Sequence, residues 1–232
     1  MNFGVVVFPG SNCDDDMIHV LGNVMDCTVH KIWHKESDIS IYGKLDCIIV
    51  PGGFSYGDYL RSGAIARYSP VMKEVIRFAE AGGYVFGICN GFQVLTEAKL
   101  LPGVLLRNAG QKFICRNIYL RNETTNSALT CKIDSGKIMK VPIAHADGRY
   151  FIDDDGLESL KKNDQILFSY CDENGDRTTD SNINGSIDNI AGICNKNRNV
   201  FGMMPHPERA SEDALGNIDG KIMFESLLAC MN

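Results

Sequence analysis

The sequence predicts a single α/β domain, residues 1–232, built on an open, mostly parallel sheet with helices on both faces. Short apolar runs bounded by turn residues recur along the chain, and amphipathic stretches lie between them. Continuous apolar runs are typical of strands that are buried on both faces, as in parallel sheets. Strands that alternate with helices place those helices on both faces of one sheet. Residues 112–143 are more β-like and predict a small antiparallel addition.

The individual elements follow from the apolar runs and their flanking residues. Five runs are predicted to be strands: Phe3–Phe8, Asp46–Val50, Tyr84–Ile88, Ile166–Tyr170 and Val200–Met204. Three stretches are predicted to be helices: Asn12–Met25, Pro70–Ala81 and Lys221–Met231. The first begins with three aspartates, which suit the positive end of a helix dipole. The second has a serine cap, a proline in its first turn and a Gly-Gly pair after its end.

Composition excludes several classes of protein. The 23 basic and 29 acidic residues give a net charge of −6, which argues against a nucleic-acid partner bound through its phosphates. No apolar run approaches the ~18–20 residues of a membrane helix. The N-terminal residues lack the basic region of a signal peptide. We therefore expect a cytoplasmic protein that binds neither nucleic acid nor membrane.

The nine cysteines do not form a metal-binding pattern, because no Cys-x-x-Cys pair occurs. A chain of this length does not need a disulfide scaffold, so eight of them are expected to be structural thiols in a reducing cytosol. No metal or cofactor site is predicted.

The exception is Cys89, which lies between a predicted strand and a predicted helix in the sequence Gly87-Ile-Cys-Asn-Gly91. A nucleophile with a glycine two residues to either side is typical of the sharp strand-to-helix turn called a nucleophile elbow. The glycines remove side chains that would clash, and the helix N-terminus stabilises a thiolate. The pattern predicts a nucleophilic cysteine with a strained backbone and φ > 0.

A catalytic base must be one of five histidines, and His206 is the best placed. It follows a predicted buried strand and precedes Pro207, which favours an extended conformation. Extended residues two apart point to the same side, so Glu208 can orient the imidazole of His206. Cys89, His206 and Glu208 are thus predicted to form a nucleophile–base–orienter triad.

A third segment, Val50–Ala64, follows another predicted strand, where active-site loops gather in α/β sheets. Gly52 and Gly53 let backbone N–H groups approach a substrate closely, and Gly53 is a candidate oxyanion donor. A phosphate-binding loop is the competing interpretation, but no Gly-Lys-Ser/Thr ending or Gly-x-Gly-x-x-Gly motif is present.

Together these three segments resemble the class I (triad) glutamine amidotransferases. More narrowly, the sequence resembles the branch of glutaminase subunits of phosphoribosylformylglycinamidine synthases, over nearly the whole chain from Val5 onwards. Six segments carry this likeness: PGGFSYGDYLRSGAIAR, GICNGFQVL, FICRN, PIAHADGRYF, INGSIDNIAGI and GMMPHPERA.

The resemblance implies a flavodoxin-like α/β fold and hydrolysis of L-glutamine to glutamate through a γ-glutamyl thioester on Cys89. It assigns the oxyanion to the N–H groups of Gly53 and Asn90. It also implies substrate contacts by Gly52 and Gln93, and it places Arg116 and His145 along the site or a partner interface.

The same resemblance implies that the ammonia passes to a large synthetase subunit, with a small accessory subunit in the complex. That partner uses ATP and Mg²⁺ to convert formylglycinamide ribonucleotide to its amidine. No cofactor is expected in this chain, which agrees with its lack of a phosphate loop.

The segment around His145 departs from the family pattern, since Ala146-Asp147 stands where Gly-Glu is expected. Two other functions stay open: a stand-alone γ-glutamyl hydrolase or cysteine peptidase-like hydrolase, and a silent regulatory subunit. The latter predicts a missing triad residue, but Cys89, His206 and Glu208 are all present.

Overall fold

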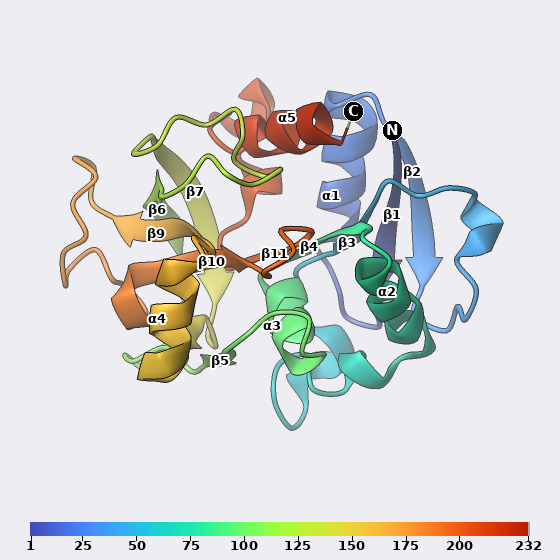
Figure 1. Cartoon of the computed structure of the whole chain (residues 1–232), viewed down its shortest axis with the longest axis horizontal. Coiled ribbons are helices and arrows are strands. Elements are labelled where there is room, and N and C mark those ends of the chain that lie inside the picture. Colours follow the sequence, from blue (N-terminus) through green and yellow to red (C-terminus); the bar gives the residue numbers. More distant parts are fainter. Residues whose placement is uncertain (232) are drawn as a thin grey trace.

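The computed structural model describes residues 1–231 and contains one large mixed sheet (Figure 1). Its strand order is β2-β1-β3-β4-β11-β10-β9-β6-β7. The first half is parallel and consists of β2 (Thr28–Trp33), β1 (Asn2–Val7), β3 (Cys47–Val50), β4 (Tyr84–Ile88) and β11 (Val200–Met203). This order is that of a flavodoxin-like sheet.

The second half of the sheet is antiparallel. It consists of β10 (Ile190–Cys194), β9 (Ile166–Cys171), β6 (Ile114–Asn122) and β7 (Ile138–His145). A separate antiparallel pair joins β5 (Val104–Leu106) to β8 (Arg149–Phe151).

The α/β class is confirmed, and so are the antiparallel ribbon in residues 112–143 and the strand Tyr84–Ile88 with its bounds. The antiparallel part is larger than expected. In particular, the run Ile166–Tyr170 was expected in the parallel sheet, but β9 is antiparallel to both of its neighbours. All its residues after Ile166 are buried, so its apolar pattern matches that of a parallel strand.

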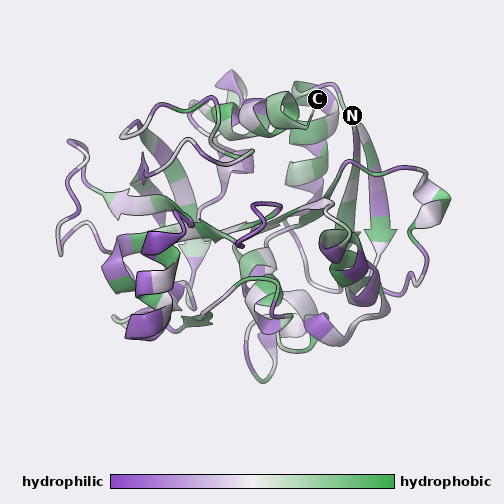
Figure 2. Ribbon diagram, viewed as in Figure 1, coloured by the Kyte–Doolittle hydropathy of each residue, from purple (hydrophilic) through white to green (hydrophobic). Residues whose placement is uncertain are grey.

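Except for α4 (Asp154–Lys162), which lies beside the antiparallel half, the helices lie on both faces of the parallel half (Figure 1). They are α1 (Asp14–His19), which continues into a π-helical turn at Val20–Val24, α2 (Pro70–Glu80), α3 (Asn90–Glu97) and α5 (Lys221–Cys230). In Figure 1, α1 and α5 lie above this part of the sheet, and α2 and α3 lie below it. Figure 2 shows hydrophobic residues on the central strands and on α1 and α5, whereas α4 is largely hydrophilic. Within residues 1–231, no helix has the length and apolar character that a membrane span requires.

The three predicted helices are present, and each ends within the predicted range. The additional helix α4 begins at a side-chain cap, since Gly156 N–H donates to Asp153 Oδ1 at 2.8 Å. The expectation of eight structural thiols is wrong for two of them, because Cys131 and Cys230 form a disulfide. The reason is tertiary: Lys132 N–H donates to Ser226 Oγ of α5 at 3.2 Å, so the two segments pack together although they are 99 residues apart.

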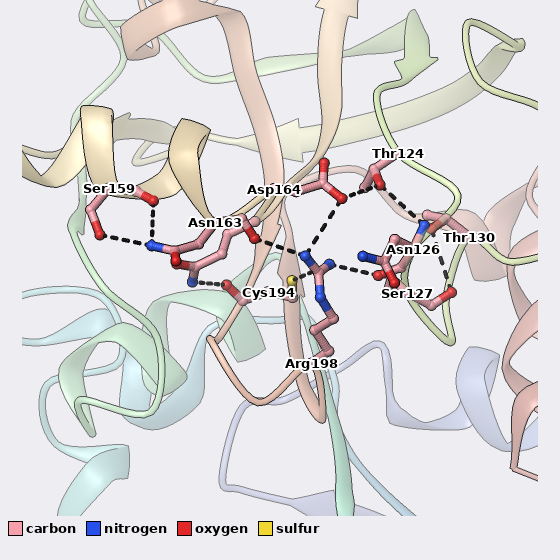
Figure 3. A network of polar contacts seen from close by, with 10 residues as sticks. Thr124, Asn126, Ser127, Thr130, Ser159, Asn163, Asp164, Cys194 and Arg198 are labelled. Carbon is pink, nitrogen blue, oxygen red and sulfur yellow. Dashed lines mark hydrogen bonds and ion pairs between the residues drawn. The ribbon is translucent and has the colours of Figure 1, made fainter.

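A polar network joins three loops at the amino end of β11 (Figure 3). Arg198, in the turn before β11, donates to the carbonyl oxygens of Asn126 at 2.6 Å and Asn163 at 2.7 Å. Thr124 Oγ1 donates to Asp164 Oδ2 at 2.7 Å, which also contacts the Arg198 guanidinium. The network anchors the edge of the sheet that lies opposite the carboxyl ends of the parallel strands.

Candidate active site

The predicted elbow is present at the carboxyl end of β4. Cys89 separates β4 from α3 and has φ 51° and ψ −107°, so the prediction of a positive φ is confirmed. A Cβ on Gly91 would lie 1.8 Å from the carbonyl oxygen of Val50, and one on Gly87 would lie 2.8 Å from Gly91. The two glycines therefore let α3 begin directly against the end of β3.

His206 and Glu208 lie just past the end of β11. The Nδ1 of His206 and the Oε1 of Glu208 share a hydrogen bond of 2.6 Å, and each residue is 1% exposed. The backbone of His206 is held in place by β7, since its N–H donates to the carbonyl oxygen of Pro142 at 2.8 Å. Burial by itself lowers the pKa of His206, but the charges of Glu208 and Cys89 outweigh it and raise the pKa to about 10. The pair is therefore suited to hold an imidazolium beside a thiolate.

Gly52 lies between the nucleophile and the base. A Cβ on Gly52 would lie 2.8 Å from Cε1 of His206 and 3.4 Å from Cβ of Cys89. The loops that follow β3, β4 and β11 thus lie next to one another, and the last two of these loops carry the three predicted triad residues. This is the carboxyl edge of the parallel strands, the usual place for sites in such sheets.

The two candidate oxyanion donors, Gly53 and Asn90, have unpaired backbone N–H groups within residues 1–231. The loop after β1 holds the neighbouring residues: Cys13 N–H donates to Gly52 O at 3.3 Å, and Phe54 N–H donates to Gly10 O at 2.8 Å. Residues on either side of Gly53 are therefore tied to this loop, while the Gly53 N–H remains available to an incoming oxygen.

Cys89 opens onto a small pocket of about 30 Å³. It is lined by Gly53, Phe54, Asp58, Ser62, Cys89, Gln93, Ala144, His145, Ala146 and Asp147. The Nε2 of Gln93 donates to the carbonyl oxygen of Asp147 at 2.7 Å. Gln93 and His145, both predicted from the resemblance, thus lie beside the nucleophile.

His145 is 3% exposed, and its Nδ1 lies 3.1 Å from Oδ1 of Asn108. Burial and the neighbouring charge of His206 lower the pKa of His145 to about 4, so its imidazole is neutral near pH 7. Its Nε2 is buried and has no hydrogen-bond partner in the described chain.

Arg116 does not join this pocket. It lies on the exposed part of β6 and lines a different cavity of about 580 Å³, formed with Tyr119 and the segment after β9. The sequence places Arg116 in the segment FICRN, and the strand pairing sets it opposite Ile143 of β7. That Arg116 lines the site or a partner interface stays a prediction.

Two polar residues of the site, Asp58 and Asn108, were missed from the sequence, and Asp147 was noted there only as a departure from the family pattern. Asp58 accepts a hydrogen bond of 3.0 Å from Asn90 Nδ2, and burial raises the pKa of its carboxyl. Asn108 positions His145, and Asp147 accepts from Ser62 Oγ at 2.9 Å. The shortened side chain of Asp147 thus has a partner in this chain. The local sequence Tyr-Gly-Asp could have indicated Asp58, whereas Asn108 contacts His145 across 37 residues of chain.

One cluster of potential metal ligands occurs in the described residues, where Cys13 Sγ, a nitrogen of His206 and an oxygen of Glu208 lie within 4.8 Å of one another. It does not fit a metal ion, because Glu208 Oε1 already shares a hydrogen bond of 2.6 Å with His206 Nδ1 and Cys13 Sγ lies against the Arg209 guanidinium.

Comparison with known proteins extends over the whole chain. A family model described as a CobB/CobQ-like glutamine amidotransferase domain matches residues 1–221. A Koribacter versatilis protein named phosphoribosylformylglycinamidine synthase subunit PurQ is 55% identical over 231 residues, covering 100% of this chain and 99% of its own. An Aquifex aeolicus protein of the same name is 50% identical over 229 residues, covering 99% of this chain and 100% of its own. A chain in a solved structure of PurLQS from Thermotoga maritima is 39% identical, with a TM-score of 0.86 and coverage of 100% and 99%.

Proposed function

Because the chain belongs to the family of glutamine amidotransferases with a CobB/CobQ-like domain, we propose that it is the glutaminase subunit of a phosphoribosylformylglycinamidine synthase. Two relatives with that subunit's name share half or more of their residues with it over nearly their whole length. The observation that carries the proposal is the strained Cys89 at the carboxyl edge, with Gly52 between it and the bonded pair of His206 and Glu208.

The first chemical step is attack of the Cys89 thiolate on the side-chain amide carbon of glutamine. The carbonyl oxygen gains negative charge in this step. The unpaired N–H groups of Gly53 and Asn90 are suited to hold it, because neither has to give up another hydrogen bond. Gly52 and Gln93 contact the substrate next to this point.

His206 then acts as acid and base. Its raised pKa keeps it protonated near pH 7, so it can donate a proton to the departing ammonia. A γ-glutamyl thioester remains on Cys89. Neutral after this transfer, His206 takes a proton from water, which attacks the thioester and releases glutamate. Glu208 holds the ring in the required orientation throughout.

The pocket beside Cys89 is small, about 30 Å³, and the segment after β3 lies over it. We expect this segment to shift when glutamine binds. Three apolar side chains of this segment are exposed: Phe54 at 47%, Tyr59 at 75% and Leu60 at 93%. Such an apolar patch is typical of a surface that a partner protein covers.

The ammonia would pass to a large synthetase subunit that uses ATP and Mg²⁺ to form the amidine, a reaction of purine biosynthesis in the cytoplasm. A small accessory subunit completes the proposed complex. The solved chain with 39% identity belongs to an assembly named PurLQS, which supports a complex of this kind.

The test measures amidine formation by the chain mixed with its synthetase partner, ATP, Mg²⁺ and formylglycinamide ribonucleotide. Either glutamine or an ammonium salt supplies the nitrogen. Cys89→Ala should lose glutamine-dependent activity by several orders of magnitude, since the nucleophile is gone. Its ammonia-dependent activity should equal that of the wild type. The matched control is Cys47→Ala, a free and buried cysteine on β3 away from the pocket.

The proposal would be contradicted if the wild-type chain gave no product with glutamine while ammonia still supported turnover. Hydrolysis of γ-glutamyl peptides without the partner would then favour the stand-alone hydrolase. If Cys89→Ala keeps glutamine-dependent activity, the elbow is not the site of attack.

A further inference from the structure

Two carboxylates line the pocket beside Cys89, and no step of the proposed reaction uses them. Asp58 lies in the segment after β3, and Asp147 lies in the turn between β7 and β8. Burial raises the pKa of the Asp58 carboxyl, and the nearby charge of Asp147 raises it further. Two residues from distant parts of the chain thus place negative charge next to the nucleophile.

The chain itself compensates these charges only in part. Asp58 accepts a hydrogen bond of 3.0 Å from the neutral amide of Asn90, and within residues 1–231 no basic side chain forms an ion pair with it. Asp147 accepts from Ser62 Oγ at 2.9 Å, and its one ion pair in the described chain is with the exposed Arg107, at 3.8 Å. A partly buried carboxylate without a close cation is costly, so both groups are suited to a positively charged ligand.

His145 supplies a third acceptor, and this one has no partner in the described chain. It lines the same pocket, is 3% exposed, and has a buried Nε2 without a hydrogen bond. Its tautomer follows from Asn108, whose Nδ2 donates to the carbonyl oxygens of Lys112 and His145, so that Oδ1 is the atom facing the imidazole Nδ1. Since an amide oxygen only accepts, Nδ1 carries the proton and Nε2 offers a lone pair. An unpaired acceptor at this depth indicates a ligand that donates hydrogen bonds.

We propose that Asp58, Asp147 and the Nε2 of His145 form the subsite for the α-ammonium group of glutamine. A primary ammonium donates three hydrogen bonds and accepts none, which matches three acceptors around one pocket. Its charge compensates the two carboxylates. The inference rests on the proposed glutaminase function and adds the group by which the site selects its substrate, a primary ammonium on the carbon chain of the amide.

The two carboxylates are connected through α3, the helix that begins at the nucleophile. Asn90 Nδ2, which donates to Asp58, also donates to Gln93 Oε1 at 2.8 Å. Gln93 Nε2 in turn donates to the carbonyl oxygen of Asp147 at 2.7 Å. An ammonium bound between the carboxylates is therefore held at a fixed distance from Cys89, which positions the amide carbon for attack.

The experiment compares two reagents that alkylate Cys89 and differ only in the α-ammonium group. One is the diazoketone analogue of L-glutamine, which loses N₂ as the sulfur is alkylated, and the other is the same diazoketone without its α-amino group. The inactivation rate of each is measured for the chain mixed with its synthetase partner, and mass spectrometry verifies that Cys89 is modified. The wild type should react much faster with the reagent that carries the ammonium.

Asp58→Asn and Asp147→Asn should each reduce this preference by about tenfold or more, as expected for the loss of a hydrogen bond to a charged group. Asp147→Glu keeps the charge and should retain most of the preference. The matched control is Asp155→Asn, which removes one negative charge from the exposed first turn of α4 and should leave the preference unchanged.

An unchanged preference in the Asn variants, or equal slowing with both reagents, would overturn the proposal, because a merely structural role affects both reagents alike. Two variants at separate positions keep the test decisive if one of them does not fold. Rapid reaction of the wild type with the glutamine analogue, together with an unchanged preference in the variants, would reject the subsite and leave the glutaminase function standing. Failure of both reagents at Cys89 in the wild type would contradict the glutaminase function itself.

Discussion

At Gly52, the absence of a side chain lets three loops meet. Cys89, His206 and Cys13 come from the ends of β4, β11 and β1, and all three approach the position that a Cβ would take on Gly52. The sequence suggests Gly52 only as a place where backbone can approach substrate. The structure adds a second requirement, that the nucleophile and the base come together across it.

Gly52→Ala should reduce glutamine-dependent activity on the order of 10²-fold, because a displacement of about 1 Å at reacting groups costs that much. The added methyl group would lie 2.8 Å from His206 Cε1. The measurement is kcat/KM with glutamine against kcat/KM with ammonia, and only the first should fall. The control is Gly110→Ala, where a Cβ meets nothing within 4 Å. Unchanged glutamine kinetics in Gly52→Ala would show that the site tolerates the displacement.

Among the elements, the segment after β3 combines backbone strain with exposed apolar side chains. Tyr56, Asp58 and Leu60 have φ values of 54°, 53° and 71°, which non-glycine residues rarely adopt. Tyr56 is fixed by its hydroxyl, which lies 2.6 Å from His34 Nδ1 and 2.8 Å from Ser69 Oγ. A segment that is pinned at Tyr56 and yet exposes Leu60 is suited to present a fixed apolar surface to a partner.

Leu60→Asp should weaken assembly with the synthetase partner by about tenfold or more, as expected for a central apolar contact. The dissociation constant is measured by surface plasmon resonance with the synthetase immobilised. Ile41→Asp is the control: Ile41 is 65% exposed but lies in the turn before β3, at the opposite ends of the strands. Equal weakening by both variants would indicate general repulsion and not a contact of this segment.

For the whole molecule, two buried histidines couple stability to pH in opposite directions. The pKa of His206 rises from 6.5 to about 10 in the folded chain, so its stabilising contribution is complete below pH 6.5 and is lost as the pH rises toward 10. The pKa of His145 falls from 6.5 to about 4, so the folded state loses stability as the pH falls from 6.5 toward 4.

The thermal midpoint should therefore be highest near pH 6.5, where neither histidine has yet lost its contribution. Differential scanning calorimetry in a series of buffers measures it. In His206→Gln the decline on the alkaline side should be smaller than in the wild type. An alkaline decline of the same size in both proteins would mean that the charge of His206 does not stabilise the fold.

Prediction from the sequence succeeded where the cause is local. The run Tyr84–Ile88 forms β4, and the positive φ of Cys89 follows from the glycines around it. Glu208 reaches His206 as predicted, but Pro207–Arg209 form a 3-10 turn and not the extended backbone from which the contact was expected. Such relations depend on a few consecutive residues, so a single sequence contains them.

The sequence by itself determined the α/β class, the strands and helices that build the carboxyl edge, and the chemistry offered there by Cys89, His206 and Glu208. Only the tertiary structure decided that β9 runs antiparallel, that Arg116 lines another cavity, that Cys131 bonds to Cys230 and that Cys13 lies against His206. The physical reason is the same in each case. Burial of an apolar strand does not encode its direction, and the contacts of a side chain far along the chain are set by how the whole sheet packs.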